Sequence, residues 1–365
     1  MNIGNVIASG IVFVMSGAMA LHAVTVSDVT ARQRYPWNGL VDVRFNITGD
    51  SNMKYDIALM AKDMEGGTNV TMKTIRKSDG SLVAGNEQFA PGTYNWIWDA
   101  ATDLPKDWKC NRVTVTVTAV AHTYLYMVID LSSGANSGLY PVSYLDAVPS
   151  GGWDDTYKTT KLVLRRVAKG SNSAGGSMTK DMWVGIFEVT GQQYVLVKGT
   201  FSESRGGSTY YKPDSNPTAA AGCMDYRCKS FLSTLKSRSG VNVRLPTASE
   251  WQYACRAGTK TDYNNGTSAS KANMNTVGWH SENIGTTKPA IVGKKAANAW
   301  GLYDMHGNQE EQVSDIYFQV GGEGGCFCGG SWDHRYLYCT SKFEHGRELK
   351  SYILQGGFRV FADME

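Results

Sequence analysis

The sequence carries few charges and almost no excess of either sign. Charged residues make up 19% of the 365 residues, below the roughly 25% of typical soluble domains. The 36 Lys and Arg residues barely outnumber the 33 Asp and Glu residues, so the formal net charge is +3. No run of basic residues forms a local positive patch. Because such a surface offers no field for a phosphate backbone, we expect no nucleic-acid partner.

Low-complexity segments and internal repeats are also missing, which excludes long disordered tracts, solenoids and propellers. Glycine, by contrast, is abundant: the chain has 40 glycines, about 11% of its residues against the usual ~7%. The length is sufficient for two or three domains, each with its own core. The composition therefore predicts a globular protein rich in loops and sheet.

The N-terminus indicates export. Residues 6–21 are apolar and uncharged, and small residues suited to signal-peptide cleavage follow at 18–20 and 21–23. The run is shorter than the ~20 residues that span a bilayer, and no later segment is long and apolar enough to cross one. We predict that residues 1–23 are a signal peptide of a periplasmic, extracellular or cell-surface protein. An uncleaved anchor stays open, because only the α-amino group is positive before the apolar run.

Export permits disulfide bonds, so the cysteines matter. Their number is odd, which leaves at least one thiol unpaired unless it bridges two chains. The sequence does not fix the pairing. The seven residues are Cys110, Cys223, Cys228, Cys255, Cys326, Cys328 and Cys339.

Residues 24–121 alternate apolar and polar side chains with the period of two of a β-strand. Turn residues such as Asp79-Gly80 and Pro91-Gly92 recur at intervals typical of a sandwich. This predicts an antiparallel, immunoglobulin-like β-sandwich of about 100 residues. The aromatic stripe within it suits either a carbohydrate platform or core packing, and we expect core; it consists of Tyr94, Trp96 and Trp98.

The pattern changes in residues 122–365, where short helices are expected among Gly- and Asn-rich loops. Thr247 and Glu250 form a capping box, which predicts a helix that stops at Gly258. Thr190 with Gln193 predicts a brief helix that ends near Gly199. A third helix, up to Gly240, places Cys228 on its buried face.

Four ordered sequence motifs carry a family resemblance. They read RLPTASEWQYACRAG at 244–258, WGLYDMHGN at 300–308, GGSW at 329–332 and GFR at 357–359. They resemble the successive signatures of the sulfatase-modifying factor family, which includes the formylglycine-generating enzyme, and the similarity extends from about Leu125 to the C-terminus. The resemblance implies a C-type-lectin-like, loop-rich domain, so the expected fold class of the whole chain is α+β.

The turn after residue 303 is rich in oxygen ligands. Two carboxylates and two backbone carbonyls within eight residues suit a hard cation such as calcium, and a solvated acidic turn is the alternative. In the family, the matching positions bind structural calcium; here they are Asp304, Gly307, Gln309 and Glu311. A second family site would use the side chain of Asn273 and the carbonyl of Met274. Glu310 and Gln312 stand where the family usually carries tryptophans.

The family's oxidase chemistry needs two cysteines that hold copper, because Cu(I) prefers thiolates. In the enzymes that this chain resembles, both cysteines follow the Gly-Gly-Ser motif, whereas here only Cys339 does. The resemblance further implies that Cys339 is a structural half-cystine paired with Cys228. We therefore expect no catalytic residues of the family type, and no copper.

Cys326 and Cys328 are the remaining candidates for metal chemistry. Strand alternation would point both sulfurs to one side. They precede the Gly-Gly-Ser motif and have no histidine cluster beside them. A shared metal ion, a disulfide of one of them with Cys223, and two inert thiols all remain open.

A short C-terminal stretch combines aromatic, charged and hydrogen-bonding side chains, a composition suited to recognition. A further resemblance, to the variable proteins of diversity-generating retroelements, fits this stretch, and ordinary divergence is the alternative. We predict a non-catalytic domain that binds a protein or glycan. The alternatives are a copper oxidase using displaced cysteines and a structural cell-surface protein. The predicted ligand-binding residues are Trp332, Asp333, His334, Arg335, Tyr336, Tyr338, Phe343, Glu344 and His345.

Overall fold

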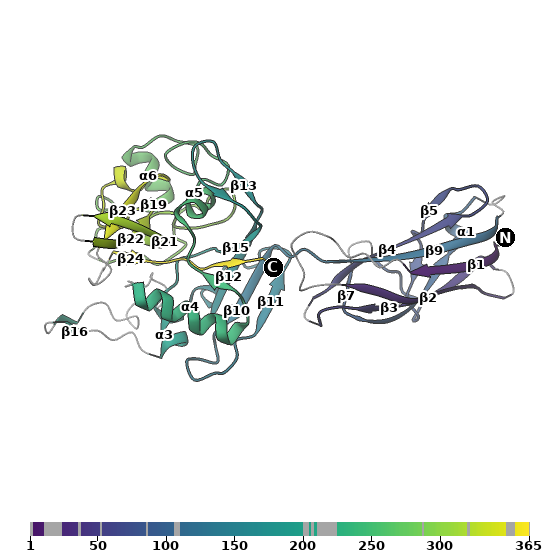
Figure 1. Ribbon diagram of the computed structural model, residues 1–365. Coiled ribbons are helices and arrows are strands. Elements are labelled where there is room, and N and C mark those ends of the chain that lie inside the picture. The colour runs from purple at the N-terminus through teal and green to yellow at the C-terminus, as the bar shows by residue number, and fades with distance from the viewer. Residues whose placement is uncertain are drawn as a thin grey trace. The chain divides into compact units, whose positions relative to one another are not determined.

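A computed structural model describes most of the chain (Figure 1). The described residues are 3–10, 24–35, 38–51, 53–84, 87–105, 110–199, 204–205, 208–209, 225–286, 288–319, 322–347 and 355–364. The chain divides into two compact units, residues 1–123 with residue 365, and residues 124–364. The first consists mainly of strands, and the second mixes strands with short helices.

The first unit contains two sheets. One has the order β2-β3-β8-β6, with antiparallel neighbours throughout. Its strands are β2 (Thr25–Gln33), β3 (Leu40–Thr48), β6 (Ile75–Arg76) and β8 (Gly92–Asp99). The other has the order β1-β9-β4-β5, and β7 also pairs with β4. Its strands are β1 (Ile3–Gly10), β4 (Tyr55–Asp63), β5 (Asn69–Thr71), β7 (Gln88–Phe89) and β9 (Cys110–Ala121). A single turn of helix, α1 (Ala100–Asp103), follows β8.

The alternation along these strands gives each sheet one buried face. Apolar residues of β3 and β9, from Val41 to Ala119, join one hydrophobic cluster to which both sheets contribute. Trp96 and Trp98 are buried in it, and Tyr94 packs against it. The aromatic stripe is therefore core, as expected, because the inward positions of β8 face the other sheet.

Part of the predicted signal peptide lies in a strand. Residues 3–10 form β1, which pairs in parallel with β9 from Cys110 to Val117. Residues 11–23, with the expected cleavage sites, lie outside the described residues. Signal-peptide removal therefore stays a prediction, and β1 belongs to the uncleaved chain. In the described part of the chain, none of the helices is long and apolar enough to cross a membrane.

The second unit is built around a six-stranded antiparallel sheet with the order β11-β10-β12-β15-β25-β18. Its strands are β10 (Tyr126–Asp130), β11 (Val142–Leu145), β12 (Lys161–Val167), β15 (Met182–Gly185), β18 (Val243–Arg244) and β25 (Phe361–Asp363). A four-stranded sheet has the order β23-β22-β21-β24. It contains β21 (Glu310–Gln319), β22 (Gly322–Cys328), β23 (Glu344–Arg347) and β24 (Gly356–Gly357).

Three two-stranded pairs complete the strands of the described part. They are β13 (Gly170–Ser171) with β14 (Ser177–Met178), β16 (Ser204–Arg205) with β17 (Ser208–Thr209), and β19 (Gly278–Trp279) with β20 (His306–Gly307). Short strands joined by long loops agree with the high glycine content.

The predicted helices are present. The Thr247 and Glu250 capping box opens α5 (Ala248–Arg256), and a second box at Thr190 and Gln193 opens α3 (Gly191–Lys198). The third predicted helix is α4 (Asp225–Ser239), in which Cys228 is buried. The remaining helices are α2 (Thr156–Thr159), α6 (Lys271–Val277) and the 3₁₀ turn η2 (Tyr336–Tyr338).

Candidate functional site

The loop from β22 to β23 folds back on itself at Gly330. This glycine has a φ of +68°, and a Cβ atom placed on it would lie 2.2 Å from the carbonyl oxygen of Tyr338. Only glycine fits there. The loop is also tied to the body of the unit, because Trp332 N–H donates to the carbonyl of Asn308 at 2.7 Å. The side chains that follow are thus held by a close-packed turn.

We call this region the 333–345 face. The exposed residues of this region, among which Tyr338 is 50% exposed, are Asp333, Arg335, Leu337, Tyr338, Lys342 and Glu344. Its half-buried members are His334, Tyr336, Phe343 and His345. Trp332, which was predicted to bind ligand, is only 7% exposed. So buried a side chain offers little surface to a ligand, and a binding role for Trp332 stays a prediction.

Aromatic rings contact one another across this face. The ring centroids of Tyr338 and Phe343 are 5.4 Å apart, and those of His334 and Phe343 are 5.7 Å apart. His345 adds a second imidazole 5.6 Å from the ring of His334. Contacting rings of this kind give a surface that loses little side-chain entropy when a partner binds.

Glu310 lies beneath the 333–345 face and was not among the predicted site residues. Its side chain is buried, and its carboxylate faces Nδ1 of His345 at 3.4 Å and Nδ1 of His334 at 4.0 Å. Arg347 Nε lies against the other carboxylate oxygen. The signal in the sequence was that an acid replaces the tryptophan usual in the family.

The predicted disulfide between Cys228 and Cys339 is wrong. Cys339 is a free, fully buried thiol, whereas Cys228 is disulfide-bonded. The sulfur of Cys339 points to carbonyls of its own loop, 3.7 Å from that of Arg335 and 3.8 Å from that of Ser331. The tight turn after Gly330 therefore directs this side chain into a separate small core with Tyr263.

Cys326 and Cys328 point to the same side of β22, as the alternation predicted, and both belong to the main core of the unit. Both are free thiols, so the suggested disulfide with Cys223 is wrong. The hydrogen bond that the Cys328 thiol donates to Cys326, together with burial, raises the pKa of Cys328. Burial also raises the pKa of Cys339, and that of Cys255 to about 12. The thiolate forms that copper chemistry requires are thus disfavoured.

At the predicted calcium turn, the carboxylate of Glu311 is engaged. Arg359 Nη2 donates to its Oε1 at 2.6 Å, and Trp251 Nε1 donates to its Oε2 at 2.6 Å. Asp304 fits a cation better. Its Oδ2 accepts from Gly293 N–H, whereas its buried Oδ1 has no hydrogen-bond partner in the described structure. Burial raises the pKa of Asp304 to about 6. Calcium binding at this turn stays a prediction. In it, the Glu311 carboxylate would contact both the calcium ion and the Arg359 guanidinium.

Gly307 and Gln309, the other two predicted calcium ligands of that turn, make backbone contacts in the structure. Gly307 pairs with Trp279 in the short β19–β20 ladder, and Gln309 N–H donates to the buried carboxylate of Glu188 at 2.9 Å. Asn273 and Met274, the partial second site, lie in α6. The side-chain amide of Asn273 donates to the carbonyl of Ser268, and the carbonyl of Met274 accepts a hydrogen bond from the backbone N–H of Gly278, which ends the helix.

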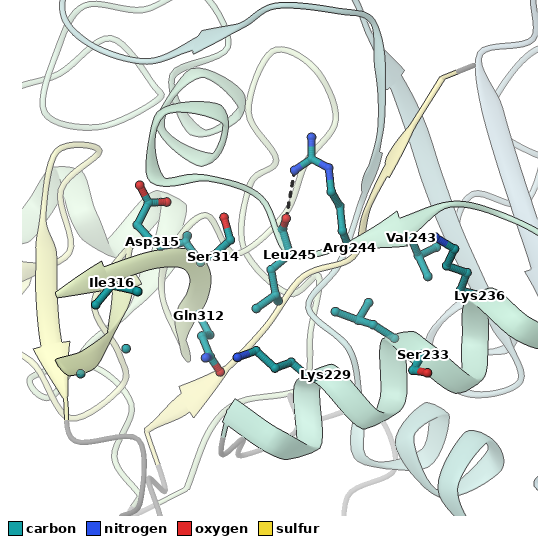
Figure 2. Close-up of a pocket in the computed structure, with 14 residues that line it drawn as sticks. Lys229, Ser233, Lys236, Val243, Arg244, Leu245, Gln312, Ser314, Asp315 and Ile316 are labelled. Carbon is teal, nitrogen blue, oxygen red and sulfur yellow. Dashed lines mark hydrogen bonds between the residues drawn. The ribbon is translucent and has the colours of Figure 1, made fainter.

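A pocket that the sequence did not predict lies between α4, β18, β21 and β22 (Figure 2). Its volume is about 400 Å³, and Lys229, Lys236 and Asp315 are among the polar side chains that line it. Arg244 also lines it but is committed to Glu250, with Nη1 donating to its carboxylate at 2.7 Å. The lining residues come from four separate elements, so no local sequence pattern indicates it.

Comparison with known proteins identifies the second unit. The family model described as the sulfatase-modifying factor enzyme 1-like domain matches residues 171–364, more than half of the chain. The chain belongs to this family. The four sequence motifs lie within the matched segment, and two of them meet in the core, where Trp251 and Arg359 both hold Glu311.

Individual similarities are distant. A protein called chaperone protein LppX, from Paenibacillus barcinonensis, is 27% identical over 189 residues, which cover 40% of this chain and 66% of the relative. Among solved structures, Treponema denticola variable protein 1 matches with 19% identity and a TM-score of 0.48, over 56% of this chain and 95% of that one. PvdO from Pseudomonas aeruginosa matches with 19% identity and a TM-score of 0.45, over 58% and 97%.

Proposed function

We propose that this protein is an exported, non-catalytic binding protein of the sulfatase-modifying factor family, whose ligand is a protein or glycan. The 333–345 face is its binding surface. Residues 24–121, as an immunoglobulin-like sandwich, act as a spacer, and the C-terminal domain has the C-type-lectin-like fold of its family.

The observation that carries this proposal is the contrast between two neighbours. Cys339, the one cysteine after the Gly-Gly-Ser motif, is fully buried, whereas Tyr338 beside it is 50% exposed. The segment that carries the oxidase cysteines in related enzymes thus presents an aromatic side chain outward and its thiol inward. Exposed tyrosines and arginines are the side chains that dominate binding surfaces.

The second candidate is an oxidase that uses Cys326 and Cys328, and their contact across one side of β22 favours it. Their burial, 3% and 0% exposed, opposes it, because a substrate peptide has to reach the sulfurs. Copper-dependent oxygen consumption with a cysteine-containing sulfatase peptide distinguishes the two. Turnover by the purified protein would refute the non-catalytic proposal.

Binding is tested with glycan and protein arrays. The variant Asp333→Ala/Arg335→Ala/Tyr338→Ala should lose the binding that the full chain shows, because all three side chains are exposed on the face. Its stability should change little, since exposed substitutions usually cost within ~0.5 kcal/mol each. Leu139→Ser, at a position 65% exposed elsewhere on the same unit, is the control and should bind normally.

Two outcomes would contradict the proposal. Undiminished binding by the triple variant would move the binding surface elsewhere, and the pocket of Figure 2 would be the next place to substitute. A full chain that binds nothing on either array would favour a structural cell-surface protein.

A further inference from the structure

Glu310 is a buried acid that needs a positive partner. It begins β21, its side chain is 0% exposed, and its backbone N–H donates to the carbonyl of Gln355 at 2.9 Å. A carboxylate taken out of water costs several kcal/mol unless cations or hydrogen-bond donors compensate it. Arg347 supplies one charge at Oε1, and Oε2 faces the two imidazoles.

Two histidines complete a compact group of ligand atoms. His345 comes from β23, which pairs with β22, and His334 comes from the loop held by the Gly330 turn. One ligand atom from each of Glu310, His334 and His345 lies within 4.8 Å of the other two. The backbone thus brings three ligand side chains from separate segments to one point.

The separations suit a small divalent ion. Metal bonds of about 2.0–2.1 Å in a tetrahedral site place neighbouring ligand atoms about 3.3–3.4 Å apart. Oε2 of Glu310 lies 3.4 Å from Nδ1 of His345 and 4.0 Å from Nδ1 of His334. The ligand atoms of the two imidazoles lie within 4.8 Å of each other, so the rings would move closer together when a metal binds.

The surroundings leave the site accessible. The side chains of His345 and His334 are 37% and 20% exposed, and the aromatic rings of Tyr338 and Phe343 lie beside them. Ser331 competes for Nδ1 of His334, because its N–H donates to that nitrogen at 3.1 Å and its Oγ lies 3.2 Å away, and a metal would replace both contacts.

We propose that Glu310, His334 and His345 form a binding site for a divalent transition metal of the zinc type. Two imidazoles and one carboxylate are a ligand set that zinc and non-haem iron(II) use in sites that keep a coordination position open. The open position would face the 333–345 face, where a donor group of a bound molecule can reach it. The site goes beyond the proposed function and does not depend on it, since it is measured with metal alone.

The test uses the untagged full chain, stripped with chelator and titrated with Zn²⁺ by calorimetry. We expect one ion per chain. His345→Ala should weaken binding by at least about 100-fold, because loss of even an outer-shell partner costs 10–100-fold. The substituted ring is partly exposed, so the fold should persist, and unchanged hydrogen exchange checks this. His122→Gln, a histidine of the first unit beside Asp56, is the matched control and should bind normally.

A second readout guards against binding elsewhere. Co²⁺ in place of Zn²⁺ should give a spectrum of nitrogen and oxygen ligands, and Glu310→Gln should abolish it. Absence of stoichiometric binding, undiminished Zn²⁺ binding by His345→Ala, or the intense charge-transfer band of thiolate ligands would each overturn the proposal. The array experiment on the metal-free chain tests the binding surface separately. If that chain binds an array ligand but no Zn²⁺, the metal site fails and the binding surface stands.

Discussion

The strongest stability prediction concerns Arg359. Its guanidinium is fully buried, pairs with Glu311 at 2.6 Å and donates to the carbonyls of Gly185 and Tyr303 at 2.9 and 2.7 Å. Arg359→Met leaves Glu311 as a buried acid whose remaining donor among the described contacts is Trp251. Removing one partner of a buried ion pair costs about 3–5 kcal/mol. The two carbonyls also lose their donor, so we expect the upper end, about 5 kcal/mol.

The assay is hydrogen exchange of the full chain by mass spectrometry. Because the chain has two units, a single melting curve would not assign the loss to one of them. Peptides from α5 and β21 should exchange about 10³- to 10⁴-fold faster, because each 1.4 kcal/mol of lost stability is a factor of ten. Peptides from β3 and β8 in the first unit should be unchanged.

Two further variants make the result interpretable. Arg359→Met with Glu311→Leu removes both charges and should recover at least half of the loss, since an apolar replacement of a whole buried pair is often close to neutral. Arg335→Met removes an exposed pair, 3.6 Å from Glu282, and should cost less than about 1 kcal/mol. If Arg359→Met costs no more than Arg335→Met, the buried network does not stabilise the unit as argued.

Two predictions concern the thiols and calcium. In the described part of the chain, the four free thiols should resist iodoacetamide at pH 8 in the native protein and react after unfolding, because they are buried. Native labelling of Cys339, detected by peptide mapping, would contradict this. If calcium occupies the turn at Asp304, chelator should lower the melting temperature of metal-loaded protein, because an ion bound to the folded state alone stabilises it. Asp304→Asn should remove most of that difference, whereas identical curves for the natural chain would refute the site.

Much of the local structure follows from the sequence. The period of two in β3 and β9 placed their valines in a core, and the capping boxes at Thr190 and Thr247 began α3 and α5. The sequence motifs identified the family. These features depend on backbone geometry and on neighbours a few residues away, so short stretches of sequence determine them.

The tertiary structure decided which distant side chains meet. Cys339 is a free, buried thiol and Trp332 is buried, and no local pattern in the sequence predicts either outcome. Glu310 and His345 are 35 residues apart in the chain, yet their side chains are 3.4 Å apart. Such contacts depend on how loops close and strands pair between segments that are far apart in the chain, where no sequence periodicity links the residues. The sequence therefore determined the elements and the family, and the packing of the loops decided the chemistry of the face.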